Sequence, residues 1–413
     1  MPPMSDTSAE TILVEAFPAA RPSLRLAVVT ETWPPEINGV SLTLSRLVQG
    51  LRARNHEVQL IRPRQTREDA ARSDPGFHEV LMRGMPIPRY PELKLGLPGK
   101  GALVRAWTLR RPDLVHIATE GPLGWSALQA ARRLRLPVTS DFRTNFHAYS
   151  QHYGVGWLKT PIVAYLRKFH NLTRCTMVPT QSLRAELQAI GFRNVSVVAR
   201  GVDTQRFNPA RRSAALRASW GAGDGTLVMV AVGRLAAEKN LGVVLQAYEA
   251  MRAQNPDVKL VFVGDGPQRA ALRQRCPEAL FAGMRRDEDL AAHYASADLF
   301  AFASLTETFG NVTIEALASG LPVLAFDTAA AGDWVRGGHN GWLLPVDDEA
   351  AFARQAALLA RDPALVRMAA SQARAQVAAL DWRHIAGQVE GIFLQTVGWP
   401  HALPEGWSPS LAL

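Results

Sequence analysis

The chain contains few cysteines and no long apolar run. Only two cysteines, Cys175 and Cys276, occur among its 413 residues, and they lie in separate halves without metal-ligand spacing. This argues against a disulfide framework and makes a reducing compartment the expectation. No stretch approaches the roughly 18 uncharged apolar residues that a transmembrane helix needs. Residues 1–22 lack a basic segment followed by an apolar one, so they predict a flexible leader rather than a signal peptide.

Nucleic-acid-binding motifs are also absent from the sequence. It has no helix-turn-helix, zinc knuckle or RNA-binding aromatic motif, so its net charge of +9 does not predict a nucleic-acid partner. The positive charge is concentrated in residues 1–200, which contain 27 Lys+Arg and 15 Asp+Glu (+12). Residues 201–413 contain 19 Lys+Arg and 22 Asp+Glu (−3). We expect the basic amino-terminal half to meet an anionic membrane or an acidic substrate.

Apolar sequence is plentiful, and its arrangement predicts an α/β fold. Hydrophobic residues make up 47% of the chain, and its length of 413 residues favours two domains. Residues 24–30 predict a strand that runs into a glycine-containing loop and a helix at 42–51, the usual start of a doubly wound domain. Residues 62–100, rich in Arg, Pro and Gly, predict a long excursion. Residues 227–232 predict an unbroken strand that opens a second domain.

The most informative stretch is residues 304–323. An apolar run at 298–303 predicts a buried strand, and a polar loop then leads into a helix at 312–318. Thr and Asn residues of the loop are expected to cap that helix. This places Glu307 on the loop and Glu315 in the first turns of the helix, with backbone amides between them.

A loop that leads into a helix N-terminus can bind an anion such as phosphate, because the free amides and the helix dipole both attract negative charge. Carboxylates bind hydroxyl groups. Glu307 and Glu315 on either side of such a loop therefore suit a molecule with a sugar at one end and a ribose at the other. From the spacing alone, an ordinary α/β turn with two surface acids is an equal alternative.

Charged residues follow other predicted strands. Arg234 and Lys239 come just after the strand at 227–232. A nucleotide-sugar leaving group gains negative charge as its glycosidic bond breaks, so two fixed cations would stabilise the transition state. Solvated surface charge is the alternative. Asp287-Glu288-Asp289 has metal-binding spacing, but it precedes a predicted helix whose dipole favours acids, so we expect no metal site there.

The pattern Glu307-x7-Glu315 resembles the signature of retaining glycosyltransferases of family 4, which have the GT-B fold. Asn38-Gly39-Val40 and Gly201-Val202-Asp203 are similar to further motifs of that family and occur in the expected order. The resemblance covers almost the whole chain. It implies two Rossmann-like doubly wound domains that face each other across a cleft, with the last helix crossing back to the first domain. The implied parts are the leader (1–22), an acceptor-side domain (23–200), a nucleotide-sugar-binding domain (201–385), and a crossover helix with a tail (386–413).

The resemblance also implies roles for individual residues. Glu307 would bind hydroxyls of the donor sugar, Glu315 would hold the ribose, and Arg234 and Lys239 would stabilise the departing diphosphate. An oxygen of the leaving phosphate would accept the acceptor's proton on the same face, so neither a carboxylate nucleophile nor a metal or other cofactor is expected. The other implied donor contacts are Gly39, Gly264, Gly283, Phe309, Gly310, Asn311 and Val312.

Residues 141–145 narrow the resemblance to bacterial lipid glycosyltransferases, which include GDP-mannose-dependent mannosyltransferases and sulfolipid synthases. That branch usually has Ser-Phe/Tyr-His-Thr-Asn here, whereas this chain has Asp141 first and Arg143 in place of the histidine. The histidine usually contacts the donor sugar or the acceptor. Arg143 could instead bind phosphate or an acidic acceptor, and His147 could supply the imidazole or be a helix-surface residue. Asp141, Arg143 and His147 form the expected acceptor or sugar site.

The implied activity is transfer of a hexose, with mannose from GDP-mannose as the first expectation, to a lipid acceptor. We expect a cytoplasmic protein bound peripherally to the anionic inner face of the cytoplasmic membrane. Residues 85–95 mix basic, aromatic and aliphatic side chains, which suits a membrane interface, although a solvated loop is an equal alternative. Other open alternatives are a UDP-sugar transferase with a soluble or polysaccharide acceptor, a nucleotide-sugar 2-epimerase, and a non-catalytic nucleotide-sugar-binding protein.

Overall fold

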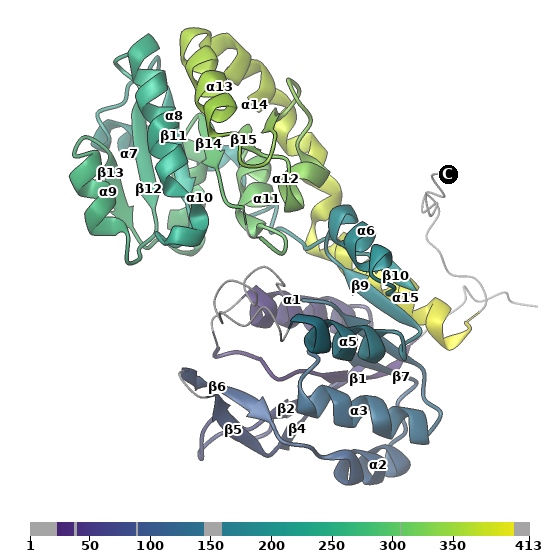
Figure 1. The fold of residues 1–413 in the computed structure, drawn as a ribbon. Coiled ribbons are helices and arrows are strands. Elements are labelled where there is room, and N and C mark those ends of the chain that lie inside the picture. Colours follow the sequence, from purple (N-terminus) through teal and green to yellow (C-terminus); the bar gives the residue numbers. More distant parts are fainter. Residues whose placement is uncertain (1–22, 37–38, 88–89, 144–158, 306, 400–413) are drawn as a thin grey trace, which may run out of the picture.

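Two α/β lobes make up the structure, a computed structural model. It describes residues 23–36, 39–87, 90–143, 159–305 and 307–399. The expected leader and the last residues of the expected tail lie outside these ranges. One lobe is coloured purple to teal in Figure 1, and the other green to yellow. No helix in the described part of the chain is long and apolar enough to cross a membrane.

The first lobe is built on an eight-stranded sheet. Its strands are β1 (Arg25–Val29), β2 (Glu57–Pro63), β3 (Ser73–Asp74), β4 (Phe77–Met82), β7 (Leu114–Ile117), β8 (Val138–Asp141), β9 (Cys175–Val178) and β10 (Val195–Val197). Its helices are α1 (Gly39–Ala53), α2 (Lys100–Leu109), α3 (Pro122–Arg133), α5 (Lys159–His170) and α6 (Gln181–Ala189). The strand order is β10-β9-β8-β7-β1-β2-β4-β3, parallel except for β3.

Both faces of this sheet are buried. Val28 joins the apolar core that includes α1, whereas Val29 joins the opposite core, which includes α2 and α3. This division follows from the two-residue repeat of a strand. Burial on both faces explains why the predicted strands of this half are continuous apolar runs.

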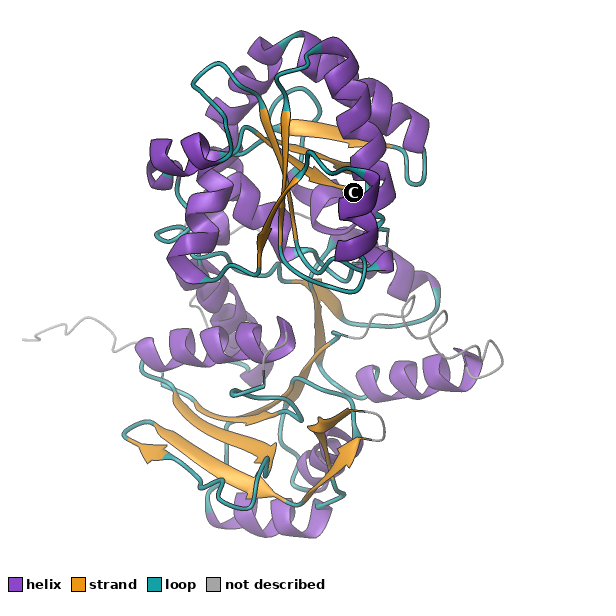
Figure 2. Ribbon diagram, turned by 90° about the vertical axis from the view of Figure 1, so that its left-hand side faces the viewer, coloured by secondary structure: helices purple, strands orange, loops and turns teal. Residues whose placement is uncertain are grey.

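The second lobe is built on a six-stranded parallel sheet, which helices surround (Figure 2). Its strands are β11 (Val228–Val232), β12 (Lys259–Val263), β13 (Leu280–Gly283), β14 (Leu299–Phe302), β15 (Val323–Phe326) and β16 (Gly341–Leu344). Its helices are α7 (Ala214–Ser219), α8 (Leu241–Gln254), α9 (Arg269–Arg275), α10 (Asp287–Ser296), α11 (Asn311–Ala318), α12 (Ala329–Trp334), α13 (Glu349–Arg361) and α14 (Pro363–Val377). The order β13-β12-β11-β14-β15-β16 reverses direction between β11 and β14, as in a Rossmann fold.

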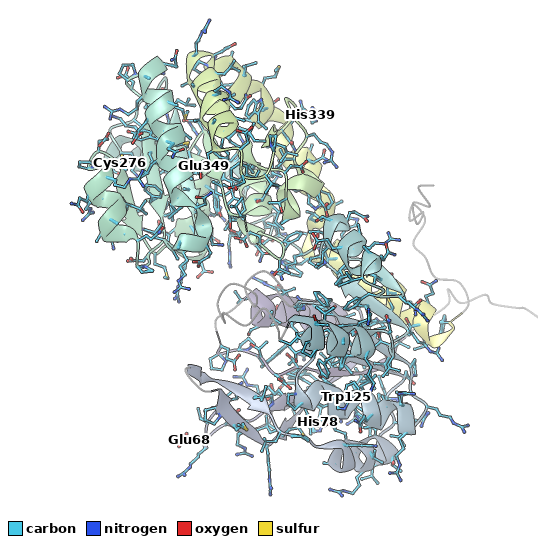
Figure 3. The ribbon with its side chains drawn as sticks, viewed as in Figure 1. Glu68, His78, Trp125, Cys276, His339 and Glu349 are labelled. Carbon is cyan, nitrogen blue, oxygen red and sulfur yellow. The ribbon has the colours of Figure 1, made fainter. Side chains whose placement is uncertain are left out.

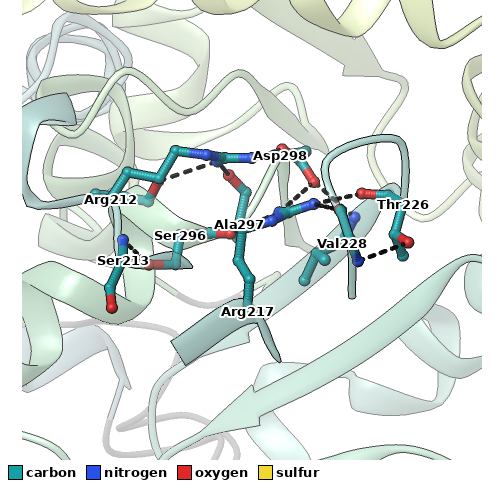
Figure 4. A network of polar contacts seen from close by, with 10 residues as sticks. Arg212, Ser213, Arg217, Thr226, Val228, Ser296, Ala297 and Asp298 are labelled. Atoms are coloured by element: carbon teal, nitrogen blue, oxygen red, sulfur yellow. Dashed lines mark hydrogen bonds and ion pairs between the residues drawn. The ribbon is translucent and has the colours of Figure 1, made fainter. Parts of the chain in front are cut away.

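A partly buried ionic network fixes the amino ends of β11 and β14 (Figure 4). Asp298, just before β14, accepts hydrogen bonds from Arg217 Nη1 and from the backbone amide of Val228, both at 2.9 Å. Arg212 Nη2 donates to its other oxygen at 2.8 Å. The network therefore holds the amino ends of β11 and β14, the two strands on either side of the reversal, in register.

The described residues of the expected long excursion at 62–100 contain four strands that the sequence did not predict. β4 pairs in parallel with β2 over six residues, and β5 (Gly84–Ile87) with β6 (Tyr90–Gly96) forms an antiparallel hairpin. A buried charge, Glu79, interrupts the apolar pattern of β4. Arg62 Nη2 donates to Glu79 at 2.9 Å, so a strand with a charged interior position is stable here.

The last helix, α15 (Trp382–Val397), returns to the first lobe, as expected. Phe393 is fully buried in the core that includes α1. Glu390 accepts a hydrogen bond from Arg54 Nε at 2.6 Å and lies 2.9 Å from His56 Nε2. The crossing segment of α15 is therefore anchored by both apolar and charged contacts.

The two cysteines are free and buried in different lobes. Cys175 is in the first sheet, and Cys276 lies in the second lobe, where Figure 3 labels it. The structure places the two cysteines apart, with no disulfide between them.

Candidate active site

The candidate site lies at the carboxyl ends of β11 and β14, where the strand order reverses and open α/β sheets bind ligands. The short helix η3 (Ala237–Lys239) after β11 carries Lys239, and the loop after β14 carries Glu307. Lys239 Nζ and Glu307 Oε1 form an ion pair. Ser304 Oγ donates to the same carboxylate oxygen at 3.0 Å. The fold thus brings together two predicted catalytic residues that are far apart in sequence.

Glu315 lies on α11, as expected, and is held by a buried tyrosine. Tyr294 Oη, on α10, donates to Glu315 Oε2 at 3.0 Å. Burial raises the pKa of Glu315 to about 7, against smaller opposing effects of the Tyr294 hydrogen bond and the charge of Arg206. The carboxylate therefore has one oxygen engaged and a fixed orientation.

The start of α11 differs from the predicted cap. The helix begins at Asn311, and its N-cap is Gly310, with a left-handed φ of 85° and no side chain to cap the first turn. The expectation of a Thr or Asn cap was wrong, because the loop reaches the helix through a conformation that favours glycine. An N-terminus without a side-chain cap keeps its amides available for an anion. Asn311 Oδ1 is buried without a hydrogen-bond partner in the described structure.

Arg234 is placed near Lys239 but is much less constrained. Its side chain is 69% exposed, and Nη1 lies 3.9 Å from Glu238 Oε1. Such an exposed pair contributes little to stability. Lys239 is therefore preorganised by Glu307, whereas Arg234 is free to reorient toward a ligand.

Gly264 and Gly283 lie at the carboxyl ends of β12 and β13, and the amide of Gly264 donates to the carbonyl of Gly283 at 2.9 Å. A Cβ atom on Gly264 would overlap the carbonyl oxygen of Gly233. The fold itself therefore requires glycine at 264. Gly283, with a φ of 76°, has open space beside it.

The first lobe contributes a charged group at the end of β8. Arg143 Nε donates to Asp141 Oδ2 at 2.9 Å, and His116 Nε2 lies 3.4 Å from the same oxygen. Burial alone would raise the pKa of Asp141, but Arg143 and His116 together hold it well below its usual value. Asp141 and Arg143 thus lie together as an ion pair, whereas His147 lies outside the described residues.

Asp287 and its acidic neighbours occupy the first turn of α10, as expected. Arg206 Nη1 lies 2.8 Å from Asp287 Oδ1, and Arg211 Nη2 lies 2.8 Å from Glu288 Oε2. These acids interact with the helix dipole and with arginines. Across the described ranges, no group of three or more His, Cys, Asp or Glu residues is placed to hold a metal ion.

Comparisons with known proteins identify the family. A family model described as Glycosyltransferase Family 4 matches residues 37–206, and one described as Glycosyl transferases group 1 matches residues 226–362. A GDP-mannose-dependent alpha-mannosyltransferase of Mycobacterium tuberculosis is 36% identical over 79% of this chain and 85% of its own length. The chain belongs to glycosyltransferase family 4. The predicted family and enzyme class are confirmed.

More distant relatives of this family 4 chain agree. The sulfoquinovosyl transferase SQD2 of Arabidopsis thaliana is 27% identical over 87% of the chain and 71% of its own length. The structure of sucrose-phosphate synthase from Thermosynechococcus elongatus matches with a TM-score of 0.69 and 21% identity, over 90% of this chain and 98% of that one. WaaG, a glycosyltransferase involved in lipopolysaccharide biosynthesis, matches with a TM-score of 0.65 and 15% identity, over 89% and 99%. The GT-B fold prediction is confirmed.

Sequence reasoning missed two residues of this family 4 site, Tyr294 and Arg200. Tyr294 lies on helix α10, and no sequence motif marks it. Phe207, in the interdomain linker (198–208), packs edge-on against its ring at 5.7 Å. Arg200 directly precedes the recognised Gly201-Val202-Asp203 motif, and that adjacency was the only available signal. Its guanidinium lies 5.8 Å from the centroid of the Phe309 ring. It also approaches Gly39, where a Cβ atom would lie 3.5 Å from Arg200 Nη1.

Proposed function

We propose that this family 4 enzyme transfers a hexose from a nucleotide sugar to a lipid acceptor with retention of anomeric configuration. Mannose from GDP-mannose is the first candidate donor. The observation that carries the proposal is the Lys239–Glu307 pair beside the uncapped start of α11, with Glu315 beyond it. The two carboxylates can accept hydrogen bonds from hydroxyl groups at either end of a ligand, and cationic and amide groups lie between them. This arrangement matches a nucleotide sugar.

In the proposed complex, Glu307 binds hydroxyls of the donor sugar and Glu315 binds those of the ribose. The amides at Gly310 and Asn311 face the diphosphate, together with Lys239 and Arg234. Because Lys239 is already paired with Glu307, its charge is in place before the donor binds. Charges positioned in advance stabilise the departing diphosphate without reorganisation during the reaction.

The proposed transfer step needs neither a protein nucleophile nor a metal ion. The bond between the anomeric carbon and the phosphate oxygen breaks while the acceptor oxygen bonds to that carbon on the same face. The acceptor's proton passes to a phosphate oxygen, and the nucleoside diphosphate leaves with it. Chelation of divalent metals with EDTA should therefore leave the rate unchanged, and a rate restored only by added metal would contradict this part of the proposal.

A lipid acceptor is supported by the relatives and by charge. An alpha-monoglucosyldiacylglycerol synthase of Streptococcus pneumoniae is 27% identical over 73% of this chain and 71% of its own length. Residues 1–200 carry a net charge of +12, which favours peripheral binding to an anionic membrane. We propose that this membrane surface is the inner face of the cytoplasmic membrane.

Particular surfaces of the first lobe suit that contact. Tyr165 on α5 and Ile190 after α6 are 38% and 40% exposed, beside Arg167 and Lys168. Apolar and basic side chains together favour the interfacial zone of a bilayer. The β5–β6 hairpin is a second candidate, because Met85 on it is 43% exposed.

The test is nucleotide release from purified protein with GDP-mannose, UDP-glucose or UDP-galactose. Each donor is offered with and without anionic vesicles that contain diacylglycerol. We expect GDP release from GDP-mannose only when lipid is present. Release of UDP from a UDP-sugar would replace GDP-mannose as the proposed donor. Nucleotide release with a soluble sugar and no lipid would replace the lipid as the proposed acceptor.

Two other results would change the reaction class. Free UDP together with an epimerised sugar would indicate an epimerase. Tight donor binding without release under every condition would indicate a non-catalytic binding protein. Vesicle binding that is unchanged by salt and by anionic lipid would contradict the peripheral electrostatic contact.

A further inference from the structure

A cavity on the first-lobe side of the cleft is lined by two arginines, Arg143 and Arg200. It lies where the end of β8, the interdomain linker and α15 meet. The carboxylate of Asp141 lines the same cavity, and Trp382 and Ile385 supply apolar walls. None of the roles assigned above uses Arg200.

Arg200 reaches both lobes from the linker. Its Nη1 atom lies beside Gly39 of the first lobe, and its guanidinium packs near the face of Phe309 on the loop that carries Glu307. Its Nε atom is buried and has no hydrogen-bond partner among the described residues. A buried donor without a partner is costly, so a ligand that accepts from it would be stabilised.

The charges around Arg200 do not neutralise it. Asp141 is engaged by Arg143, and Glu307 is engaged by Lys239. Three cations therefore face two carboxylates. Burial lowers the pKa of Arg200 to about 10, and the repulsion by Arg143 is the next largest cause, ahead of the attraction by Asp141 and Glu307.

We propose that Arg200 and Arg143 form an oxyanion-binding subsite on the first-lobe wall of the cleft. Two guanidinium groups can hold a phosphate or carboxylate through charge-assisted hydrogen bonds. The oxyanion comes either from the donor's diphosphate or from an acidic headgroup of the acceptor. Asp141 acts as the positioning residue that fixes Arg143, and His116 lies against the carboxylate of Asp141. The subsite rests on the proposed function for the identity of its ligand, but not for its ability to bind an anion.

Inorganic phosphate is the probe, and its affinity is measured by calorimetry with and without saturating GDP. We expect Arg200→Met and Arg143→Met each to weaken phosphate binding on the order of tenfold, as expected for loss of a charge-assisted hydrogen bond. Arg200→Lys should retain part of the affinity, because it keeps the charge but loses the fork of donors. Arg383→Met is the matched control, since that side chain is 83% exposed at the start of α15.

The two sources of the oxyanion are distinguished by competition. If the donor's diphosphate occupies the subsite, GDP displaces phosphate and Arg200→Met weakens GDP binding too. If an acidic acceptor occupies it, phosphate still binds to the GDP-saturated protein and GDP affinity is unchanged. Phosphate binding that neither Arg200→Met nor Arg143→Met changes, with or without GDP, would overturn the proposal. If Arg200→Met does not fold, Arg143→Met and Arg200→Lys decide the matter.

The assay is independent of glycosyl transfer. Phosphate binding that depends on Arg200, in a protein that releases no nucleotide from any donor, would leave the subsite standing and refute the transferase reaction proposed here. Normal lipid-dependent nucleotide release, together with unchanged phosphate binding in the variants, would support the transferase reaction and refute the subsite.

Discussion

The two walls of the cleft are built on different physical principles. The second-lobe wall is positioned mainly by the backbone: the reversal of strand order between β11 and β14, the glycine N-cap of α11, and the packing of Gly264 against Gly233. The first-lobe wall depends on charged side chains, with Asp141 holding Arg143 and Arg200 standing beside them. A wall built from the backbone keeps its shape when side chains change. A wall built from side chains can change its ligand by substitution.

The largest expected effect comes from removing the charge that organises the first wall. Asp141→Asn leaves two partly or fully buried groups, Arg143 and His116, without their carboxylate. We expect the free energy of unfolding to fall by about 3 kcal/mol, as for other broken buried pairs. Urea denaturation measures this. Glu278→Gln is the control, because its pair with Arg252 is exposed and should cost less than about 1 kcal/mol.

The same variant sharpens the comparison between the walls. Asp141→Asn should also weaken phosphate binding, because Arg143 loses the carboxylate that fixes its orientation. A variant that keeps wild-type stability, or that folds and keeps full phosphate affinity, would contradict the description of Asp141 as a positioning residue.

The second wall is broken by Lys239→Ala. Loss of a cation aimed at the departing diphosphate should lower kcat/KM on the order of a hundredfold, with most of the loss in kcat. Steady-state kinetics with the donor identified in the release assay measures this. Lys259→Ala, at the opposite end of the sheet on β12, should leave both constants unchanged. Wild-type kcat in the Lys239 variant would show that Lys239 serves only the pair with Glu307.

Each lobe buries a glutamate whose pKa is raised to about 7, which gives stability a predicted pH dependence. Burial raises the pKa of Glu31 and of Glu315 from 4.5 to about 7. Between those values the folded protein binds more protons than the unfolded chain, so the free energy of unfolding falls as the pH rises through this range. Above about 7 neither group contributes further change.

Replacement of either carboxyl should flatten that slope. Glu31→Gln and Glu315→Gln are each expected to remove on the order of 2 kcal/mol of the change in unfolding free energy between pH 4.5 and 7.5. Urea denaturation across this range is the measurement, with exposed Glu68→Gln as the control. An unaltered slope in both variants would mean that neither carboxyl titrates there.

The smallest effect concerns the hydrogen bond that orients Glu315. Tyr294→Phe should weaken GDP binding about fivefold, the value of one hydrogen bond. Affinity for the 2′,3′-dideoxy diphosphate should stay unchanged, because that ligand lacks the hydroxyls Glu315 would bind. Equal losses for both nucleotides in calorimetry would indicate that Tyr294 has only a packing role.

The sequence predicted the backbone-built wall better than the wall made of side chains. The strands ending at Val232 and Phe302 are continuous apolar runs, so the positions of Lys239 and Glu307 followed from where those strands stop. The start of α11 was misjudged because a left-handed Gly310 replaces the usual side-chain cap. β4 was missed because Glu79 interrupts its apolar pattern, and its partner Arg62 could not be recognised without the pairing of β2 and β4.

Arg200 shows a different limit of sequence reasoning. It follows a strand and precedes a recognised linker motif, but periodicity cannot predict where a side chain points in an irregular segment. Its neighbours Gly39, Arg143 and Phe309 come from three separate parts of the chain. Only the folded arrangement of both lobes brings them to one place.

The two connections between the lobes cross at one point. The amide of Val202 donates to the carbonyl of Leu380 at 2.8 Å, and Val202 forms a parallel bridge with Asp381. We therefore expect a rigid rotation of one lobe against the other to pivot near this crossing, and a large rotation to break the hydrogen bond from the amide of Gln181 on α6 to Asp333 on α12. Residues close to a pivot travel least, so Arg200 would remain nearly stationary while Gly39 and Glu307 swing toward or away from each other.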